Sequence, residues 1–163
     1  MAVWQHDYHL IPQAKLKEHY GRIPETVSND DYDNFDWWEG VAEPSRLEIE
    51  NILLPTKNWS DYVLKWGSDR GDRLTLYYGT EDEGKEGLLI SVELRIDLRR
   101  EFKEVRDFIL SMIALAKKHE WCFLNDGNAV LIPDYEILAK DMSLSNAQDF
   151  VDNHPVAPFV NHL

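Results

Sequence analysis

The amino-acid sequence predicts a single α+β domain over residues 1–163, with an antiparallel sheet and helices packed mainly on one face of it. Three patterns support this class. Residues 88–98 place apolar side chains at every second position, which is typical of a strand buried on one face. Residues 99–119 repeat apolar side chains at steps of three and four, which predicts an amphipathic helix. The run Asn-Asp-Gly-Asn at 125–128 separates two apolar stretches and indicates a tight hairpin. Antiparallel strands with separate helices make an α+β domain.

The first third of the chain predicts one strand and two helices. Residues 2–11 alternate well enough for an opening strand, and a helix follows between Pro12 and Gly21. Residues 23–41 have no regular period, so we expect a loop or a short helix there. A further helix is expected within residues 44–55, which begin and end with proline.

The middle of the chain predicts a helix and then a hairpin of strands. In residues 58–67, NWSDYVLKWG, the large apolar side chains are spaced by three, four and seven, which suits a short amphipathic helix ended by Gly67. Residues 68–72 are expected to form a turn and residues 73–78 a strand. Residues 80–87 then connect this strand to the alternating one.

The last third predicts the remaining strands and helices. Apolar runs at 121–124 and 129–132 flank the hairpin signal. A helix is expected over residues 133–142 and a shorter one over residues 143–151. The tail after Pro155 is expected to be irregular.

Composition limits the class of partner. Seventeen basic and 30 acidic residues give a formal charge of −13, so nucleic acid and anionic membranes would be repelled. The start of the chain lacks the pattern of a secretory leader, and no apolar run reaches the roughly 20 residues that span a bilayer. These features predict a cytoplasmic protein. The single cysteine, Cys122, lies in an apolar run and is expected to be a buried, inert thiol.

The acidic–aromatic segment, residues 29–43, is the most unusual stretch of the chain. It contains six carboxylates, four large aromatic residues and no base: Asp30, Asp31, Asp33, Asp36, Glu39 and Glu43, with Tyr32, Phe35, Trp37 and Trp38. Such a segment repels itself, and its rings are costly to leave in water. Either the tryptophans anchor it to the core while the acids are solvated, or the acids and some rings face outward and bind a basic protein. The second hypothesis assigns partner binding to Asp30, Asp31, Asp33, Asp36, Trp37, Trp38 and Glu39.

Other candidate sites are weaker. His6 and His9 would point to opposite faces of a strand, which disfavours a shared metal ion. Asp31-x-Asp33 resembles the start of an EF-hand loop, but Asp36 stands where that loop needs glycine. The sequence contains no nucleophile or phosphate-binding motif. We therefore expect no catalytic residue, no cofactor and no metal.

A second polar cluster, RIDLRR at residues 95–100, lies between the alternating strand and the long helix. Arginine forms bidentate bonds with carboxylates. We expect Arg95, Arg99 and Arg100 to hold internal carboxylates, with those near the acidic–aromatic segment as one choice of partner.

These pieces together resemble a known kind of protein. The chain combines WQHDYHLIP, an acidic WWEG, LPTKNWSDYVLKWGSDRGDRL, a long SVELRIDLRR…FILSMIALAKKHEWCFLNDGNAVLIP stretch, SNAQDFV and a closing Pro155. It resembles small acidic bacterial proteins of the polymorphic-toxin immunity type, which are single-domain α+β proteins often encoded beside toxin genes. The similarity extends chiefly over residues 45–155, through loose patterns such as WS…WG and R-x-D-x-R.

The resemblance implies stoichiometric inhibition of a toxin, with no catalysis. An acidic, aromatic surface would cover the basic site of the toxin, many of which are nucleases, and its acids would mimic substrate phosphates. The resemblance itself supplies no binding residues. Two alternatives stay open: a small hydrolase with an acid-rich cleft, and a regulatory or scaffolding domain that self-associates through the same aromatics.

Overall fold

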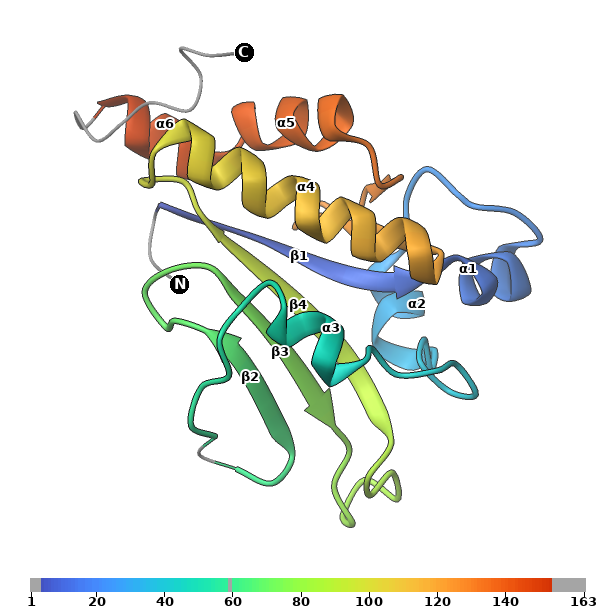
Figure 1. Ribbon diagram of the computed structural model, residues 1–163. Coiled ribbons are helices and arrows are strands. Elements are labelled where there is room, and N and C mark those ends of the chain that lie inside the picture. The colour runs from blue at the N-terminus through green and yellow to red at the C-terminus, as the bar shows by residue number, and fades with distance from the viewer. Residues whose placement is uncertain (1–3, 59, 154–163) are drawn as a thin grey trace.

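The computed structural model describes residues 4–58 and 60–153, and it confirms the α+β class (Figure 1). Within these residues the strands form one six-stranded antiparallel sheet in the order β2-β3-β4-β1-β5-β6. The opening strand therefore lies inside the sheet. The strands are β1 (Gln5–Pro12), β2 (Val63–Gly67), β3 (Arg73–Tyr78), β4 (Leu89–Asp97), β5 (Trp121–Leu124) and β6 (Val130–Leu131).

The helices begin and end close to where the sequence predicts them. They are α1 (Gln13–Tyr20), α2 (Asn29–Asn34), α3 (Arg46–Glu50), α4 (Phe102–His119), α5 (Tyr135–Ser143) and α6 (Asn146–Asn153). In Figure 1 α4 and α3 lie in front of the sheet, and α5 and α6 run beside α4. None of the helices in the described residues is long and apolar enough to cross a bilayer. The predicted irregular tail after Pro155 lies outside the described residues.

The main core lies between α4 and the face of the sheet toward it. Val92, Leu94 and Ile96 of β4 are at most 1% exposed. The buried stripe of α4 includes Val105 and Ile109, in agreement with the predicted amphipathic helix. Lys117, Lys118 and His119 lie in its last turn, where cations interact favourably with the helix dipole.

The predicted helix over residues 58–67 is wrong, because Val63–Gly67 form β2. Trp66 pairs with Leu74 of β3 and is only 3% exposed. A ten-residue helix is marginal in water, whereas the strand buries the Trp66 ring and completes a ladder with β3. Gly67 has φ +95°, and a Cβ there would lie 2.1 Å from the carbonyl oxygen of Asp72, so only glycine fits this turn.

The alternation of the long strand holds over most of its length and fails at its start. Tyr77 pairs with Ser91, whereas Tyr78 pairs with Leu89, so the register shifts by one residue at Ile90. As a result Leu89 is buried at 7% exposure, and Leu88, which the alternation placed inside, is 53% exposed. An irregularity of one residue moves a side chain to the other face of a strand.

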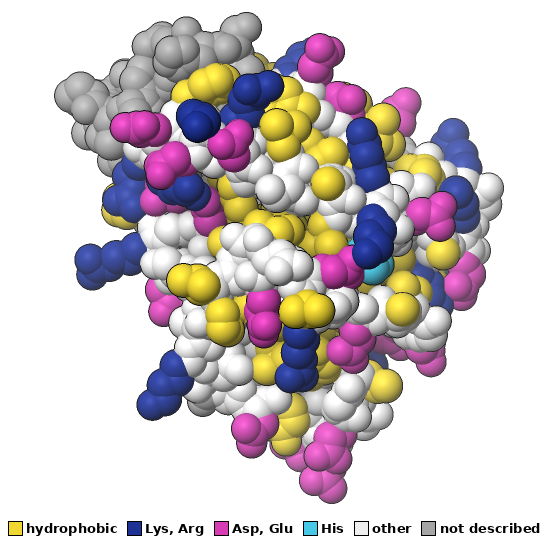
Figure 2. Space-filling view, in the orientation of Figure 1, with side chains coloured by type: hydrophobic (Ala, Val, Ile, Leu, Met, Phe, Trp, Pro, Cys, Tyr) yellow, Lys and Arg dark blue, Asp and Glu magenta, His cyan; other side chains and the backbone are white. Residues whose placement is uncertain are grey.

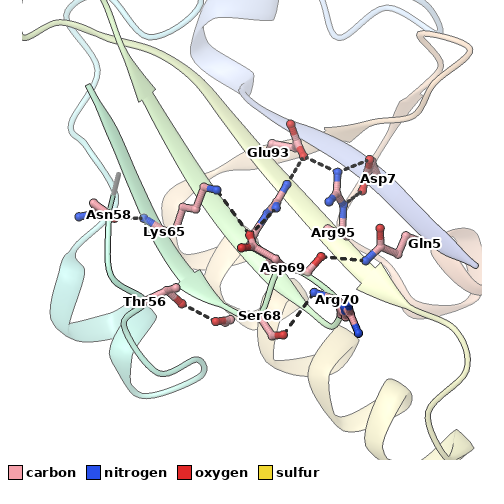
Figure 3. A network of polar contacts seen from close by, with 12 residues as sticks. Gln5, Asp7, Thr56, Asn58, Lys65, Ser68, Asp69, Arg70, Glu93 and Arg95 are labelled. Atoms are coloured by element: carbon pink, nitrogen blue, oxygen red, sulfur yellow. Dashed lines mark hydrogen bonds and ion pairs between the residues drawn. The ribbon is translucent and has the colours of Figure 1, made fainter. Parts of the chain in front are cut away.

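The second face of the sheet carries a network of paired charges (Figure 3). Arg95 donates to Asp7 at 2.8 and 3.2 Å and to Glu93 at 3.3 Å. Arg73 donates to Glu93 at 3.3 Å and to Asp69 at 3.1 Å. The side chains of Asp7 and Arg95 are only 6% and 13% exposed. Charges removed from water to this extent need close partners, and the network supplies them.

The end of β4 extends this pairing. Arg99 donates to Asp97 at 2.8 Å, and Arg100 contacts the buried Asp72. Asp72 also accepts a hydrogen bond from the backbone N–H of Asp97 at 2.9 Å. The prediction that the arginines of RIDLRR hold internal carboxylates is therefore confirmed. None of these carboxylates belongs to the acidic–aromatic segment.

Both edges of the sheet are covered by other parts of the chain. At the β2 edge the N–H of Gly67 donates to the carbonyl oxygen of Leu54 at 2.7 Å. At the β6 edge the N–H of Val130 donates to the carbonyl oxygen of Glu25 at 2.8 Å. These contacts occupy edge groups that would otherwise pair with another chain.

The Arg95–Asp7 pair yields a stability prediction. Asp7→Ala leaves a mostly buried guanidinium without its main partner, so we expect the free energy of unfolding to fall by about 3–5 kcal/mol. Chemical denaturation measures this change. Glu18→Ala, which removes an exposed carboxylate paired with Lys15, is the control and should barely change stability. A loss for Asp7→Ala as small as that of the control would contradict the assignment.

Candidate functional site

The acidic–aromatic segment begins with a capped helix. Ser28 is the N-cap of α2, and its hydroxyl oxygen accepts a hydrogen bond from the N–H of Asp31 at 3.0 Å. Asp30 and Asp31 lie in the first turn, where the helix dipole stabilises negative charge. Turns follow α2, and Gly40 adopts φ +70°. The prediction of a loop or short helix is therefore confirmed, with both present.

Trp37 is buried, with 4% of its surface exposed. Its Nε1 donates to the carbonyl oxygen of Tyr32 at 3.1 Å, which fixes the ring against α2. The ring also packs edge-on against Phe35, with 4.7 Å between centroids, and lies 6.0 Å from the His19 ring of α1. Trp37 thus ties the segment to α1.

Trp38 is also 4% exposed, but it packs elsewhere. Its ring lies edge-on to Trp121 of β5, with 5.5 Å between centroids. Adjacent residues therefore anchor the segment at two places. Both rings are almost wholly buried, although Trp38 also lines a small hollow described below, so their main role in any binding is to hold the segment in shape.

Asp31 is used inside the molecule. It accepts hydrogen bonds from Tyr20 at 2.7 Å and Ser28 at 2.8 Å, and its other oxygen lies 3.1 Å from His19 Nε2. The bonds from Tyr20, Ser28 and His19 hold the pKa of Asp31 below its ordinary value. Burial and the bond to Asp31 raise the pKa of Tyr20 to about 12. Asp31 therefore joins α1 to α2.

The remaining predicted acids point outward. Asp30, Asp33, Asp36 and Glu39 are exposed. Asp36 forms an ion pair with Lys85 of the β3–β4 connection. In Figure 2 acidic side chains gather along the lower right and lower end of the molecule, over the segment that precedes α3 and the β3–β4 connection. The structure thus brings Asp36 and Glu39 to a second acidic stretch, whereas Asp30 and Asp33 line neither of the hollows described next.

Two adjoining hollows lie where these stretches meet, and we call them together the acidic groove. One, of about 140 Å³, lies between the segment and the β3–β4 connection. The other, of about 500 Å³, lies beside α3, and the two share Glu43 and Gly87. The charged residues that line them are Asp36, Glu39, Glu43, Asp61 and Glu86, with Lys85 and Arg46 as the cations.

The floor of the acidic groove is partly apolar. Leu88 is 53% exposed and Tyr62 37% exposed, and both line it. Tyr78 donates to Glu43 at 2.9 Å. Sequence reasoning missed Asp61, Glu86 and the other acids of residues 80–87. The acid-rich run TEDEGKEG at residues 80–87 is a local signal for these acids, whereas the prediction for this run is only a connection between strands.

The two histidines of β1 have separate partners. His6 Nε2 lies 3.1 Å from Asp141 Oδ2, whereas the His9 ring packs against Tyr32 with 5.2 Å between centroids. Among the described residues, no group of three or more His, Cys, Asp or Glu side chains is arranged to hold a metal ion. Cys122 is 1% exposed, as predicted, and burial raises the pKa of its thiol to about 11.

Asp141 is the centre of a separate polar cluster between the sheet and α5. It accepts hydrogen bonds from Tyr8 at 2.8 Å and Asn125 at 2.6 Å, beside His6. Burial opposes ionisation, but the bonds from His6, Tyr8 and Asn125 outweigh it and lower the pKa of Asp141. A general acid needs a raised pKa, so this cluster suits the docking of α5 better than catalysis.

No family model matches this chain, and neither a curated protein nor a solved structure is similar enough to match it.

The burial of Trp38 gives a direct prediction. Trp38→Ala removes a ring packed on Trp121, so we expect the free energy of unfolding to fall by about 3–5 kcal/mol. The neighbouring Glu39→Gln changes an exposed side chain and should leave stability nearly unchanged. Urea denaturation of both variants compares them. Equal stability of the two would place the Trp38 ring outside the core.

Asp141 predicts a pH dependence. Because its pKa is lower in the folded protein, its charge stabilises the fold above the ordinary value of 3.8, and this contribution is lost as the pH falls through the lower folded value. Asp141→Asn should therefore lower stability at pH 7, with a difference from the natural protein that shrinks below pH 3.8. Denaturation between pH 3 and 7 measures it, with Glu136→Gln on the exposed side of α5 as the control. A difference that stays constant with pH would exclude the carboxylate charge as its source.

Proposed function

We propose that this protein is a non-enzymatic binding protein of the immunity type, which covers the basic site of a toxin with its acidic groove and the exposed acids of its acidic–aromatic segment. The observation that carries the proposal is the split between buried rings and exposed acids. Trp37 and Trp38 are each 4% exposed, while Asp36 and Glu39, which line the smaller hollow, face solvent.

The internal contacts of Trp37, Trp38 and Asp31 matter because they reduce the conformational entropy that the segment would lose on binding a partner. A flexible acidic loop would lose conformational freedom when a partner ordered it. Here the tryptophan contacts and the bonds of Asp31 already hold the segment. Pre-ordered carboxylates are suited to stand in for substrate phosphates at a basic site.

Charge supports the same proposal. With a formal charge of −13, the chain would attract a basic protein over long range and accelerate the encounter. The groove also offers Leu88 and Tyr62 as apolar contacts beside the acids. Long basic side chains combine a charged head with an aliphatic stem, so they match such a mixed surface. A cytoplasmic location is part of this proposal.

The alternatives find less support. The hydrolase hypothesis expects a carboxylate with a raised pKa in a cleft. The described carboxylates with a shifted pKa are Asp31, Glu48, Asp69, Glu83 and Asp141; each pKa is lowered, and none of these residues lines the acidic groove. Self-association through the segment would need exposed aromatic rings, and Trp37 and Trp38 are buried.

The test is capture of a partner by the immobilised protein at low salt from cells that produce it. We expect a basic protein in stoichiometric amount, released as the salt concentration rises. A triple variant with Asp36→Asn, Glu39→Gln and Glu43→Gln should slow association about tenfold. A matched triple with Glu18→Gln, Glu25→Gln and Asp107→Asn removes the same charge elsewhere and should have a much smaller effect.

A substitution at Lys85 should change the association rate in the opposite direction to the acidic triple variant. Lys85→Gln frees Asp36 from its ion pair and removes a cation from the acidic groove, so the partner should associate faster. The proposal fails if nothing basic is captured, or if both triple variants slow association equally. The second result would mean that overall charge, rather than this surface, attracts the partner.

A further inference from the structure

A second groove, lined by basic and aromatic residues, lies between α4 and α5. Its volume is about 620 Å³, within the range of about 300–1,000 Å³ typical of small-molecule sites. It is lined by Phe102, Arg106, Tyr135, Ala139, Lys140 and Ser143, with one carboxylate, Glu136. No residue of the acidic groove takes part in it.

Two cations from different helices line this groove. Arg106 comes from α4 and Lys140 from α5, so they lie on opposite walls. Within residues 4–58 and 60–153, neither forms an ion pair, although the chain has 30 acidic residues. Arg106 instead lies over the Tyr135 ring, 5.9 Å from its centroid. Both charged groups are therefore available to an anion.

The other walls are apolar. Phe102 and Tyr135 are partly buried against the core, and Ala139 is 2% exposed. A guanidinium stacked over an aromatic ring is pre-oriented and binds anions in a planar, bidentate way. The groove thus combines a polar clamp with aromatic surfaces, which is the usual composition of a small-molecule site.

We propose that the α4–α5 groove binds a small organic anion, with its carboxylate, phosphate or sulfonate between Arg106 and Lys140 and its apolar body against Phe102 and Tyr135. This site is independent of the acidic groove and of the proposed toxin binding. The attraction of an anion to a chain of charge −13 must come from this local pair of cations, because the overall field opposes it.

The test uses the fluorescent aromatic sulfonate 8-anilinonaphthalene-1-sulfonate as the probe, with the full chain. We expect saturable binding of one probe per chain. Arg106→Gln and Lys140→Gln should each weaken it about tenfold, the usual cost of one bond to a charged group. Lys117→Gln removes an exposed cation from the same helix but outside the groove, so it should bind as the natural protein does.

A matched probe separates the charge from the rings. N-phenyl-1-naphthylamine has the same rings without the sulfonate, so it should bind the natural protein more weakly and respond little to either substitution. Arg106→Lys keeps the charge but loses the planar fork, and should fall between the natural protein and Arg106→Gln. Circular dichroism shows whether each variant is folded. If Arg106→Gln is unfolded, the binding of the probe by Lys140→Gln tests the proposal.

Three results would overturn the proposal. The first is that the sulfonate probe does not bind saturably. The second is a lack of specificity: Lys117→Gln weakens binding of the sulfonate probe as much as Lys140→Gln does, or the probes with and without the sulfonate bind with the same affinity. The third is that the mass of the protein in solution rises with concentration and Arg106→Gln abolishes the rise, because the acidic segment of a second copy would then be the occupant.

Discussion

The fold depends on the central position of β1, the first strand of the chain. It pairs with β4 on one side and β5 on the other, so residues near the start of the chain lie beside residues about 84–115 positions later. Its two faces hold the two layers together. Tyr8 donates to Asp141 and holds α5, whereas Asp7 accepts from Arg95 and neutralises the opposite face. Pairing over such separations closes long loops, which favours slow folding and leaves few ways to assemble only part of the sheet.

The acidic–aromatic segment takes its shape from this frame. Trp37 packs against α1, the helix that follows β1. Trp38 packs against Trp121 of β5, the strand that pairs with β1. Two large rings at adjacent positions thus bind the segment to the helix that follows the central strand and to a strand that pairs with it. Among the acids of the segment, Asp36 pairs with Lys85 and Asp31 lies beside His19. Repulsion among these acids costs free energy, and the burial of the two rings offsets it.

The negative charge of the chain is therefore distributed unevenly. On the second face of the sheet the acids are matched by arginines and mostly shielded from water. Around the acidic groove the carboxylates outnumber the cations and face solvent. Between α4 and α5 the balance is reversed, with two unpaired cations beside aromatic rings. The three surfaces have different electrostatic character, and only the last two could take up a charged partner.

Elements whose signal is local can be predicted from the sequence alone. The stripe of α4, the alternation from Val92 to Leu98, the Asn125 hairpin and the end of α1 at Gly21 all follow from periods and turn residues that act over a few positions. The remaining features depend on tertiary contacts. The spacing around Trp66 suits a helix, but pairing with β3 and burial of the ring made it a strand. The exposure of Leu88 depends on a register shift against Tyr78, the directions of Trp37 and Trp38 depend on His19 and Trp121, and the acidic groove depends on acids from separate parts of the chain. These features arise from contacts between residues far apart in sequence, and such contacts leave no periodic pattern in the chain.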